Sequence, residues 1–188
     1  MRDLSLHLMD IVQNSISAKA ARIDILICAD SKLDLLVIEV KDNGIGMDES
    51  FLKDAANPFT TTRTTRKVGL GISLFEASAK RASGKLGITS QKMVGTKVNA
   101  SFKISHIDRL PLGDIAETMV SLIISQPDIE YNLILDNTKE RFVFSTFDIK
   151  GRIGEVPITQ FDVIKWIREY INEGIKITFG GVLDEILS

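Results

Sequence analysis

The sequence predicts an α+β protein, and three observations support this prediction. Of its 188 residues, 44% are hydrophobic, which is enough to bury a sizeable core. The hydrophobic positions change along the chain between a helical period and the alternation typical of strands. The resulting helices and strands follow one another in mixed order, without an internal repeat. A chain of this length can form one large domain or two small ones.

The first predicted element is a helix over residues 4–16. Its hydrophobic residues recur every three or four positions, as they do on the buried side of an amphipathic helix. The other side of the helix carries the polar residues His7, Asp10, Asn14 and Ser17. The hydrophobic side is therefore expected to pack on the core, and the polar side to supply functional side chains. His7 could contact a ligand there or have a structural role.

Four strands are predicted next to this helix by alternating hydrophobic residues. The first two, at 23–28 and 33–41, are joined by a short turn, and the other two, at 86–91 and 96–104, form a hairpin. Between the two pairs, the sequence predicts a short helical segment, a long polar loop and a second helix. These three lie at 50–56, 57–68 and 70–82.

The remaining residues predict a second, smaller unit. Residues 105–111 interrupt the hydrophobic pattern and form the boundary. A helix at 112–125, strands at 129–136 and 141–147 and a helix at 160–172 are expected to follow it. In the last helix, Trp166, Ile167 and Tyr170 could anchor either the core of this unit or a partner.

The charge also differs between the two parts of the chain. Residues 1–104 carry 15 Lys and Arg against 11 Asp and Glu, and residues 105–188 carry 8 against 14, within a total net charge of -2. The basic first part suits a ligand with phosphates, but its charge is too weak and dispersed for nucleic-acid binding. We therefore predict two domains, 1–104 and 105–188, of which the second is a small α+β module that binds a partner or dimerises.

No hydrophobic run has the length or composition of a signal peptide or a membrane span, so no membrane is expected among the partners. The single cysteine, Cys28, has no second cysteine with which to form a disulfide or a metal cluster, which suits a reducing compartment. The predicted location is cytoplasmic. Cys28 itself is expected to pack in the core.

Four short segments of the first part together predict a nucleotide site. In the first of them, Asp10 and Asn14 lie four residues apart on a helix, so their Cβ atoms are about 5 to 6 Å apart on one face. An amide oxygen is a hard ligand for magnesium, and a nearby carboxylate can orient or deprotonate a water molecule. An ordinary polar helix face has the same spacing, and on this pair alone it stays an alternative.

The second segment, Asp42-Asn43-Gly44-Ile45-Gly46-Met47, follows a strand. A carboxylate at that position can accept a hydrogen bond from an exocyclic amine such as that of adenine. The two glycines allow the backbone and a base to approach each other closely. Because Asn-Gly is also a common turn dipeptide, a plain turn after the strand is the alternative.

The third segment, Gly69-Leu70-Gly71, begins a helix directly after a loop that contains Arg63, Arg66 and Lys67. Free amides at a helix start can bind phosphate oxygens, and the basic side chains could close over the outer phosphates. A Gly-x-Gly sequence alone is weak evidence. The fourth segment, Gly95-Thr96, is first of all a hairpin turn.

Taken together, these segments resemble the GHKL superfamily, which includes gyrase, heat-shock chaperones of the ninety-kilodalton class, sensor histidine kinases and mismatch-repair ATPases. The resemblance covers about residues 3–104. It identifies 10–18 with the asparagine helix of the superfamily, 42–47 with its adenine-binding glycine box, and 69–72 with its lid glycine box. The loop and the helix start that follows it are especially similar to the lid region of histidine kinases.

The resemblance implies the Bergerat fold, a two-layer α/β sandwich in which helices cover a mixed, mainly antiparallel sheet. It also implies ATP and Mg²⁺ as cofactors, with Asn14 as the magnesium ligand and Asp42 on the adenine amine. The residues predicted to contact the nucleotide are Asn14, Ser17, Asp42, Gly44, Gly46, Met47, Arg63, Lys67, Gly69, Leu70, Gly71 and Thr96.

Two features depart from the superfamily pattern. The ATP-hydrolysing branches place Glu four residues before the asparagine, whereas this chain has Asp10, which reaches about 1 to 1.5 Å less far. Asp10 is still the predicted catalytic residue, but ATP binding is better supported than fast hydrolysis. Sensor kinases also carry a phosphoaccepting histidine upstream, and the asparagine helix here begins almost at Met1. Any phosphoryl acceptor is therefore expected on another protein, as in anti-sigma-factor kinases.

These observations predict an ATP-binding regulatory protein of the histidine-kinase-like ATPase type. It would bind Mg-ATP under a mobile lid and signal to, or phosphorylate, an unidentified partner protein. The alternative is a non-catalytic ATP/ADP sensor or a slow ATPase that acts as a conformational switch. A homodimer is left open by the sequence.

Overall fold

The computed structural model describes residues 2–48 and 70–180. Its helices are α1 (Leu4–Ser17), α3 (Leu70–Arg81), α4 (Ile115–Ser125), α5 (Thr146–Ile153) and α6 (Phe161–Phe179). Its strands are β1 (Arg22–Asp30), β2 (Leu35–Asp42), β3 (Leu86–Gln91), β4 (Gly95–Lys103), β5 (Glu130–Asp136) and β6 (Arg141–Ser145).

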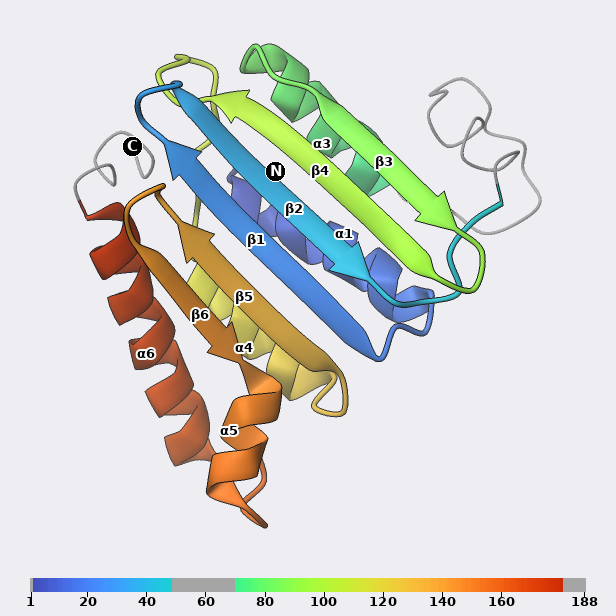
Figure 1. The fold of residues 1–188 in the computed structure, drawn as a ribbon, viewed down its shortest axis with the longest axis vertical. Helices are drawn as coiled ribbons and strands as arrows, with labels where there is room; N and C mark the ends of the chain where they lie inside the picture. Colours follow the sequence, from blue (N-terminus) through green and yellow to red (C-terminus); the bar gives the residue numbers. More distant parts are fainter. Residues whose placement is uncertain (1, 49–69, 181–188) are drawn as a thin grey trace.

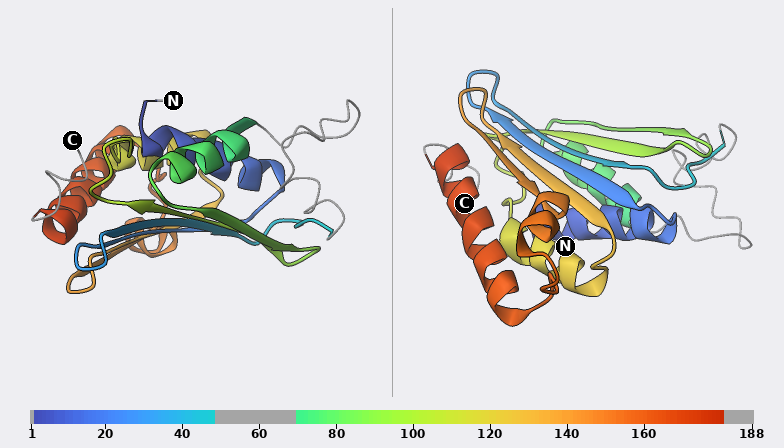
Figure 2. Two further views of the ribbon diagram at one scale, coloured as in Figure 1. Left: turned by 90° about the horizontal axis from the view of Figure 1, so that it is seen from above. Right: turned by 60° about the horizontal axis from the view of Figure 1, so that its bottom comes forward.

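The strands form one sheet in the order β3-β4-β2-β1-β5-β6, and α1, α3, α4 and α6 cover one of its faces (Figures 1 and 2). Strands β1 and β5 are parallel, whereas the other neighbouring pairs in this order are antiparallel. This arrangement confirms the predicted α+β class with a mixed, mainly antiparallel sheet. Within the described ranges, no helix has the length and hydrophobicity needed to cross a bilayer.

The hydrophobic core lies between the sheet and these helices. Alternate residues of β1 face the helices, so that Ile23, Ile25 and Ile27 are at most 1% exposed. The same core includes residues of both parts of the chain, such as Leu8 of α1 and Leu133 of β5. Burying one such aliphatic side chain contributes about 1.5 to 3 kcal/mol, so the two parts share much of their stability.

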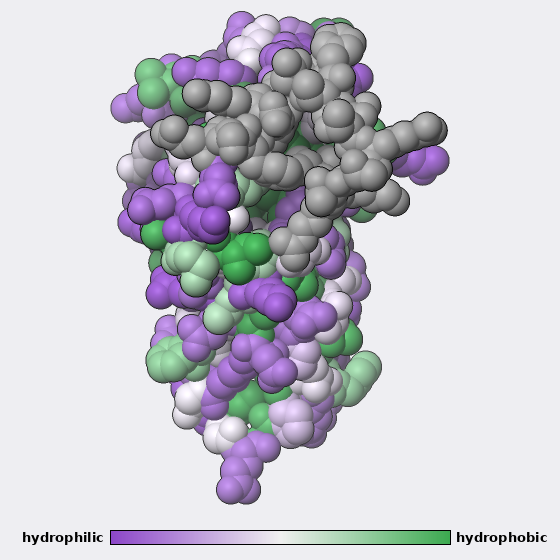
Figure 3. All heavy atoms as spheres, turned by 90° about the vertical axis from the view of Figure 1, so that its right-hand side faces the viewer, coloured by the Kyte–Doolittle hydropathy of each residue, from purple (hydrophilic) through white to green (hydrophobic). Residues whose placement is uncertain are grey.

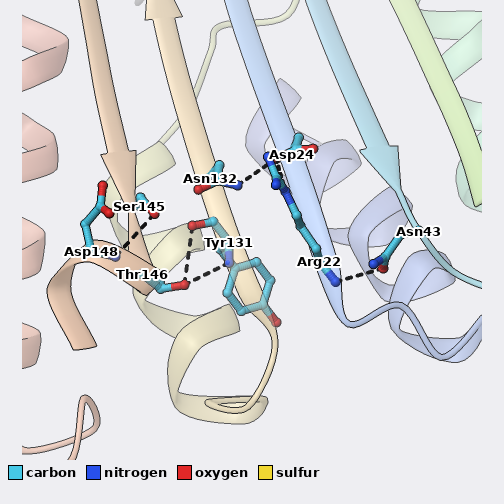
Figure 4. Close-up of polar contacts among 8 residues, drawn as sticks. All are labelled: Arg22, Asp24, Asn43, Tyr131, Asn132, Ser145, Thr146 and Asp148. Carbon is cyan, nitrogen blue, oxygen red and sulfur yellow. Dashed lines mark hydrogen bonds and ion pairs between the residues drawn. The ribbon is translucent and has the colours of Figure 1, made fainter. Parts of the chain in front are cut away.

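The residues after 104 extend the sheet of the first part. The sequence predicts a separate module here, but β5 pairs with the free edge of β1 over Arg22–Cys28. On the side away from the helices, Asn132 donates a hydrogen bond to Asp24 at 2.7 Å, and Arg22 donates to the same carboxylate at 2.9 Å (Figure 4). The pairing of two parallel strands distant in sequence cannot be deduced from the hydrophobic pattern of either. The role of this second part stays a prediction.

Most predicted elements of the first part match the structure within two residues. The predicted segments 50–56 and 57–68 lie outside the described residues. In the second part, the strand predicted to reach residue 147 ends at Ser145, whose hydroxyl caps α5 by accepting from the Asp148 amide. Cys28 is half-buried on the side of β1 away from the core, so the expectation that it packs in the core was wrong.

Candidate functional site

Three backbone segments meet at one end of the sheet, beside the C-terminal end of α1 (Figure 1). They are the turn between α1 and β1, the segment that follows β2 and the turn between β3 and β4. The Ile45 amide donates to the Ala18 carbonyl at 2.9 Å, and the Met93 amide donates to the Ile45 carbonyl at 2.7 Å. The segment after β2 is thus held between the other two by backbone hydrogen bonds.

Glycines make this contact between the three segments sterically feasible. A Cβ atom on Gly44 would lie 2.6 Å from the Ala18 carbonyl oxygen, and one on Gly46 would collide with the carbonyl of Gln91. Gly46 also has a φ of +63°, which side-chain-bearing residues rarely adopt. A Cβ on Gly95 would collide with the Asp42 carbonyl. These glycines are therefore required by the packing of the chain itself, whether or not a ligand also approaches them.

The Asp42 carboxylate lies at the centre of this end of the sheet and is 7% exposed. Its Oδ1 accepts hydrogen bonds from the Gly44 amide at 2.9 Å and the Thr96 amide at 3.2 Å. Its Oδ2 accepts from the Ser15 hydroxyl of α1 at 2.7 Å. Each donor comes from a different segment, so the carboxylate is held in one orientation.

Ser15 and Ser90 are parts of the site that the sequence analysis did not select. Ser90 of β3 accepts a hydrogen bond from the Met47 amide at 2.8 Å and donates to the Gly95 carbonyl at 3.0 Å. Its hydroxyl also lies 2.8 Å from the Thr96 hydroxyl. Either hydroxyl can be the donor of this pair, and where Ser90 donates to Gly95, Thr96 donates to Ser90. Serine is too common in helices and strands for either residue to be selected from the sequence.

Asp10 and Asn14 lie on α1, one turn apart and next to this end of the sheet. Both are half-buried and stand four residues apart on this helix. The side chain of Asp10 also touches the start of α3, since a Cβ on Gly71 would lie 2.8 Å from the Asp10 Cβ and 3.0 Å from its Oδ2. Two of the predicted segments are therefore in direct contact.

Not all predicted site residues are brought together in this way. Ser17 is exposed, and its hydroxyl donates to the Gln13 carbonyl of its own helix at 2.8 Å. Leu70 is 80% exposed at the start of α3. Arg63, Lys67 and Gly69 lie outside the described residues. Figure 3 shows this side of the molecule, on which hydrophilic and hydrophobic residues are interspersed.

Asn14 and Asp10 could hold a magnesium ion together with the phosphates of a nucleotide. Within residues 2–48 and 70–180, no group of three or more His, Cys, Asp or Glu could hold a metal ion. Magnesium usually keeps several waters and takes one or two protein ligands together with substrate phosphates. Asn14, with Asp10 beside it, can supply such a ligand on this helix face.

His7 packs between α1 and α3. It is 2% exposed and stacks on Phe75 of α3, with ring centroids 5.2 Å apart and an angle of 22° between the planes. Its Nδ1 is buried without a hydrogen-bond partner among the described residues. Burial lowers the pKa of His7 below its ordinary value of 6.5, and the negative charges of Asp10 and Asp3 oppose this shift only in part.

Comparison with known proteins decides the family. The family model "Histidine kinase-, DNA gyrase B-, and HSP90-like ATPase" matches residues 2–106, which is more than half of the chain. The chain belongs to this family. It thus contains an ATP-binding domain of the GHKL type, which confirms the resemblance and the Bergerat-type fold.

Individual relatives in this family match over part of their length. A protein of Shewanella frigidimarina (strain NCIMB 400), named "Putative sensor protein", is 31% identical over 104 residues, which are 54% of this chain and 16% of that protein. "Autoinducer 2 sensor kinase/phosphatase LuxQ" of Vibrio cholerae serotype O1 (strain ATCC 39315 / El Tor Inaba N16961) is 27% identical over 135 residues, 67% of this chain and 15% of that protein. This chain therefore spans only a small part of either relative.

A solved structure shows the same fold. The crystal structure of the N-terminal domain of a DNA repair protein aligns with a TM-score of 0.52 and 18% sequence identity. The alignment covers 76% of this chain and 52% of that chain, so it extends beyond residue 106 into the second part of the sheet or its helices. At this identity, the likeness concerns the fold alone.

We predict that Ser15→Ala weakens ADP binding about tenfold, or ~1.4 kcal/mol, because the buried Asp42 carboxylate loses one of its donors. Isothermal titration calorimetry measures this change. Ser121→Ala, at an exposed position of α4, is the matched control. Equal losses in the two variants would contradict this account of Ser15.

We also predict that the free energy of unfolding falls as the pH decreases through about 6.5. Because the folded protein lowers the pKa of His7, the unfolded chain binds more protons in the window below the ordinary value. His7 therefore contributes fully to the free energy of unfolding above this pH window, and the contribution is lost as the pH falls through the window. Urea unfolding at several pH values gives the free energy of unfolding as a function of pH. This free energy should change less with pH in His7→Phe, which keeps a ring against Phe75. His106→Phe is the control, and the same pH dependence in His7→Phe as in the wild type would contradict the prediction.

Proposed function

We propose that this chain binds magnesium–ATP at the glycine-lined end of its sheet and passes the bound state to a protein partner. The observation that carries the proposal is the fixed, buried Asp42 carboxylate. An ionised carboxylate has about four acceptor positions, of which three are used, so one stays available on Oδ2. The exocyclic amine of adenine can donate to it, whereas guanine has an acceptor oxygen at the equivalent position.

The phosphates and the magnesium ion would lie along α1, towards the start of α3. Asn14 would ligate the ion, and Asp10 would face the water or acceptor group at the outermost phosphate. The contact of Asp10 with Gly71 supports this arrangement, because it places the start of α3 beside the predicted metal site. Arg63, Lys67 and Gly69 belong to the proposal on sequence grounds alone. The proposed cofactors are therefore ATP and Mg²⁺.

The bound nucleotide could then be used in two ways. In the first, the γ-phosphoryl group passes to a nucleophilic side chain of a partner: the acceptor–phosphorus bond forms, the bond to the bridging oxygen breaks, ADP leaves, and a base takes the acceptor proton. The relative named as a sensor kinase supports this route. In the second, ATP and ADP only switch the conformation. The short Asp10 side chain supports slow or absent turnover, because it reaches less far than Glu.

Asp42→Asn is expected to weaken ADP binding at least about thirtyfold, or ~2 kcal/mol, and to reduce the preference for ATP over GTP. The amide offers only one acceptor oxygen and turns an NH₂ group towards donors. Calorimetry with Mg-ATP, Mg-ADP and Mg-GTP measures both effects. Asp108→Asn, the same change at an exposed carboxylate, is the control. The proposed function fails if the wild type binds no adenine nucleotide, or if Asp42→Asn binds as tightly as Asp108→Asn.

The fate of the phosphate is tested with γ-labelled ATP and proteins captured from the source cell. For the kinase route, label appears on a captured protein and is lost with Asp10→Asn. For the sensor route, neither labelled protein nor free phosphate appears, although ADP binding persists. Asp10→Glu distinguishes a poorly placed base from an absent one, since the longer side chain should increase phosphate release only if water attack is limited by reach.

A further inference from the structure

The sheet has a second face, which α1, α3, α4 and α6 do not cover. In Figure 1 this face points towards the viewer, and Figure 2 shows the four helices together on the opposite side. Its side chains are those that alternate with the buried ones along each strand. We call it the open face, and its composition is not that of a simple solvated surface.

A hydrophobic group occupies the centre of the open face. In the strand register, Leu26 of β1 lies beside Ile134 of β5, and Ile134 lies beside Val143 of β6. One row further along, Cys28 lies beside Val37 of β2. Val143 is 53% exposed, and the other four side chains are half-buried. These five residues, which we call the open-face stripe, run across four neighbouring strands.

The net charge of the open face differs between its strands, and the open-face stripe crosses both groups of strands, with Val37 on β2 and its other four residues on β1, β5 and β6. On β2 and β4, the charged residues of the open face are Lys41, Lys97, Lys103 and Glu39. On β1, β5 and β6, they are Arg22, Asp24, Asp30, Glu130, Asp136 and Arg141. Three lysines against one glutamate leave one side with a net charge of +2, and four acids against two arginines leave the other with -2. The open face therefore has a basic half and an acidic half, although Asp34 of the turn before β2 pairs with Lys103 at 3.7 Å and reduces the excess of positive charge on the basic half.

We propose that a second copy of this chain packs on the open face, with the two sheets face to face. A two-fold axis that lies between the sheets and runs along β1 places the basic strands β2 and β4 of each copy over β5 and β6 of the other. The same axis brings Leu26 and Cys28 of the two copies together and places Val37 of each copy near Ile134 of the other. Such a face is complementary to itself, as a symmetric dimer requires.

The open face is large enough for such a contact. Six strands about 4.8 Å apart, with a shared length of about six residues at about 3.3 Å each, span roughly 24 by 20 Å, or about 480 Å². Two copies together thus bury about 1,000 Å², not counting the additional area of protruding side chains. This area reaches the lower limit of specific interfaces. Two sheets packed in this way are about 10 Å apart, as in β-sandwiches.

The charge pattern favours a second copy over other occupants. An anionic membrane or an acidic partner would be attracted by the side of β2 and β4 and repelled by the side of β1 and β5. A basic partner would meet the reverse pattern. The nucleotide site stands apart from this contact, since Asp42 is one of the alternate, buried positions of β2 and does not belong to the open face. The dimer can therefore be tested independently of the proposed function.

Sedimentation equilibrium of the full chain tests the proposal. The wild type is expected to associate to a dimer, and higher salt should weaken it because charged groups contribute to the contact. Ile134→Lys should raise the dissociation constant at least about tenfold, since each copy would bury an unpaired charge at the centre. Ile107→Lys is the matched control, because Ile107 is 95% exposed on the segment after β4 and away from the open face. Thermal unfolding and ADP binding show that both variants are folded.

Crosslinking at Cys28 tests the position of the axis. The chain has one cysteine. A short bis-maleimide can join two Cys28 thiols, each sulfur adding to one double bond while a proton goes to the neighbouring carbon. Burial, together with Asp136 and Asp30, raises the pKa of Cys28, so the reaction is run at alkaline pH. A covalent dimer is expected for the wild type and Ile107→Lys, with at least about a tenfold lower yield for Ile134→Lys.

Three results would overturn the proposal. The first is a monomer at every protein concentration, and the second is a dimer that Ile134→Lys and Ile107→Lys affect equally. The third is a dimer that gives no Cys28 crosslink above the yield of a Cys28→Ser control, which would place the contact on another surface. A change in ADP binding alone would not produce any of these results, so failure of the proposed function can be distinguished from failure of the dimer.

Discussion

Three backbone segments approach one another so closely at one end of the sheet that no Cβ atom fits between them, and the whole nucleotide site depends on this contact. Gly44, Gly46 and Gly95 permit it. Without it, the donors that orient Asp42 would not meet, since they come from α1, from the segment after β2 and from β4. A buried carboxylate without those donors would be costly, so the turn geometry and the electrostatics of the site stabilise each other.

The sequence predicts the parts of this site that depend on local order along the chain. The helical period identified α1, and the position of Asp42 directly after a strand identified the end of the sheet. The hydrogen bonds of Ser15 and Ser90 join residues 27 and 43 positions apart, and serine is too common in turns and helices to indicate such partners. The sequence predicts that the glycines make space for a base, whereas in the structure they first make space for the protein backbone.

The fold was predicted less completely in the second part of the chain, for identifiable reasons. α5 has only eight residues and follows β6 without an intervening loop, so its first residues continue a strand-like pattern. α6 extends to Phe179, past Gly174, a residue that usually weakens a helix. That glycine is needed there because its Cβ would lie 2.6 Å from the ring of Phe142. In both cases tertiary packing outweighs the local preference.

The parallel pairing of β1 with β5 has a consequence for how the chain folds. The hydrogen bond between Asn132 and Asp24 joins residues 108 positions apart. During synthesis, one edge of β1 therefore has no partner until most of the chain has left the ribosome, and contacts over such long separations form slowly. An unpaired edge is a template for aggregation. A fragment that ended with the family match at residue 106 would leave that edge of β1 unpaired, whereas in the folded chain β5 covers it.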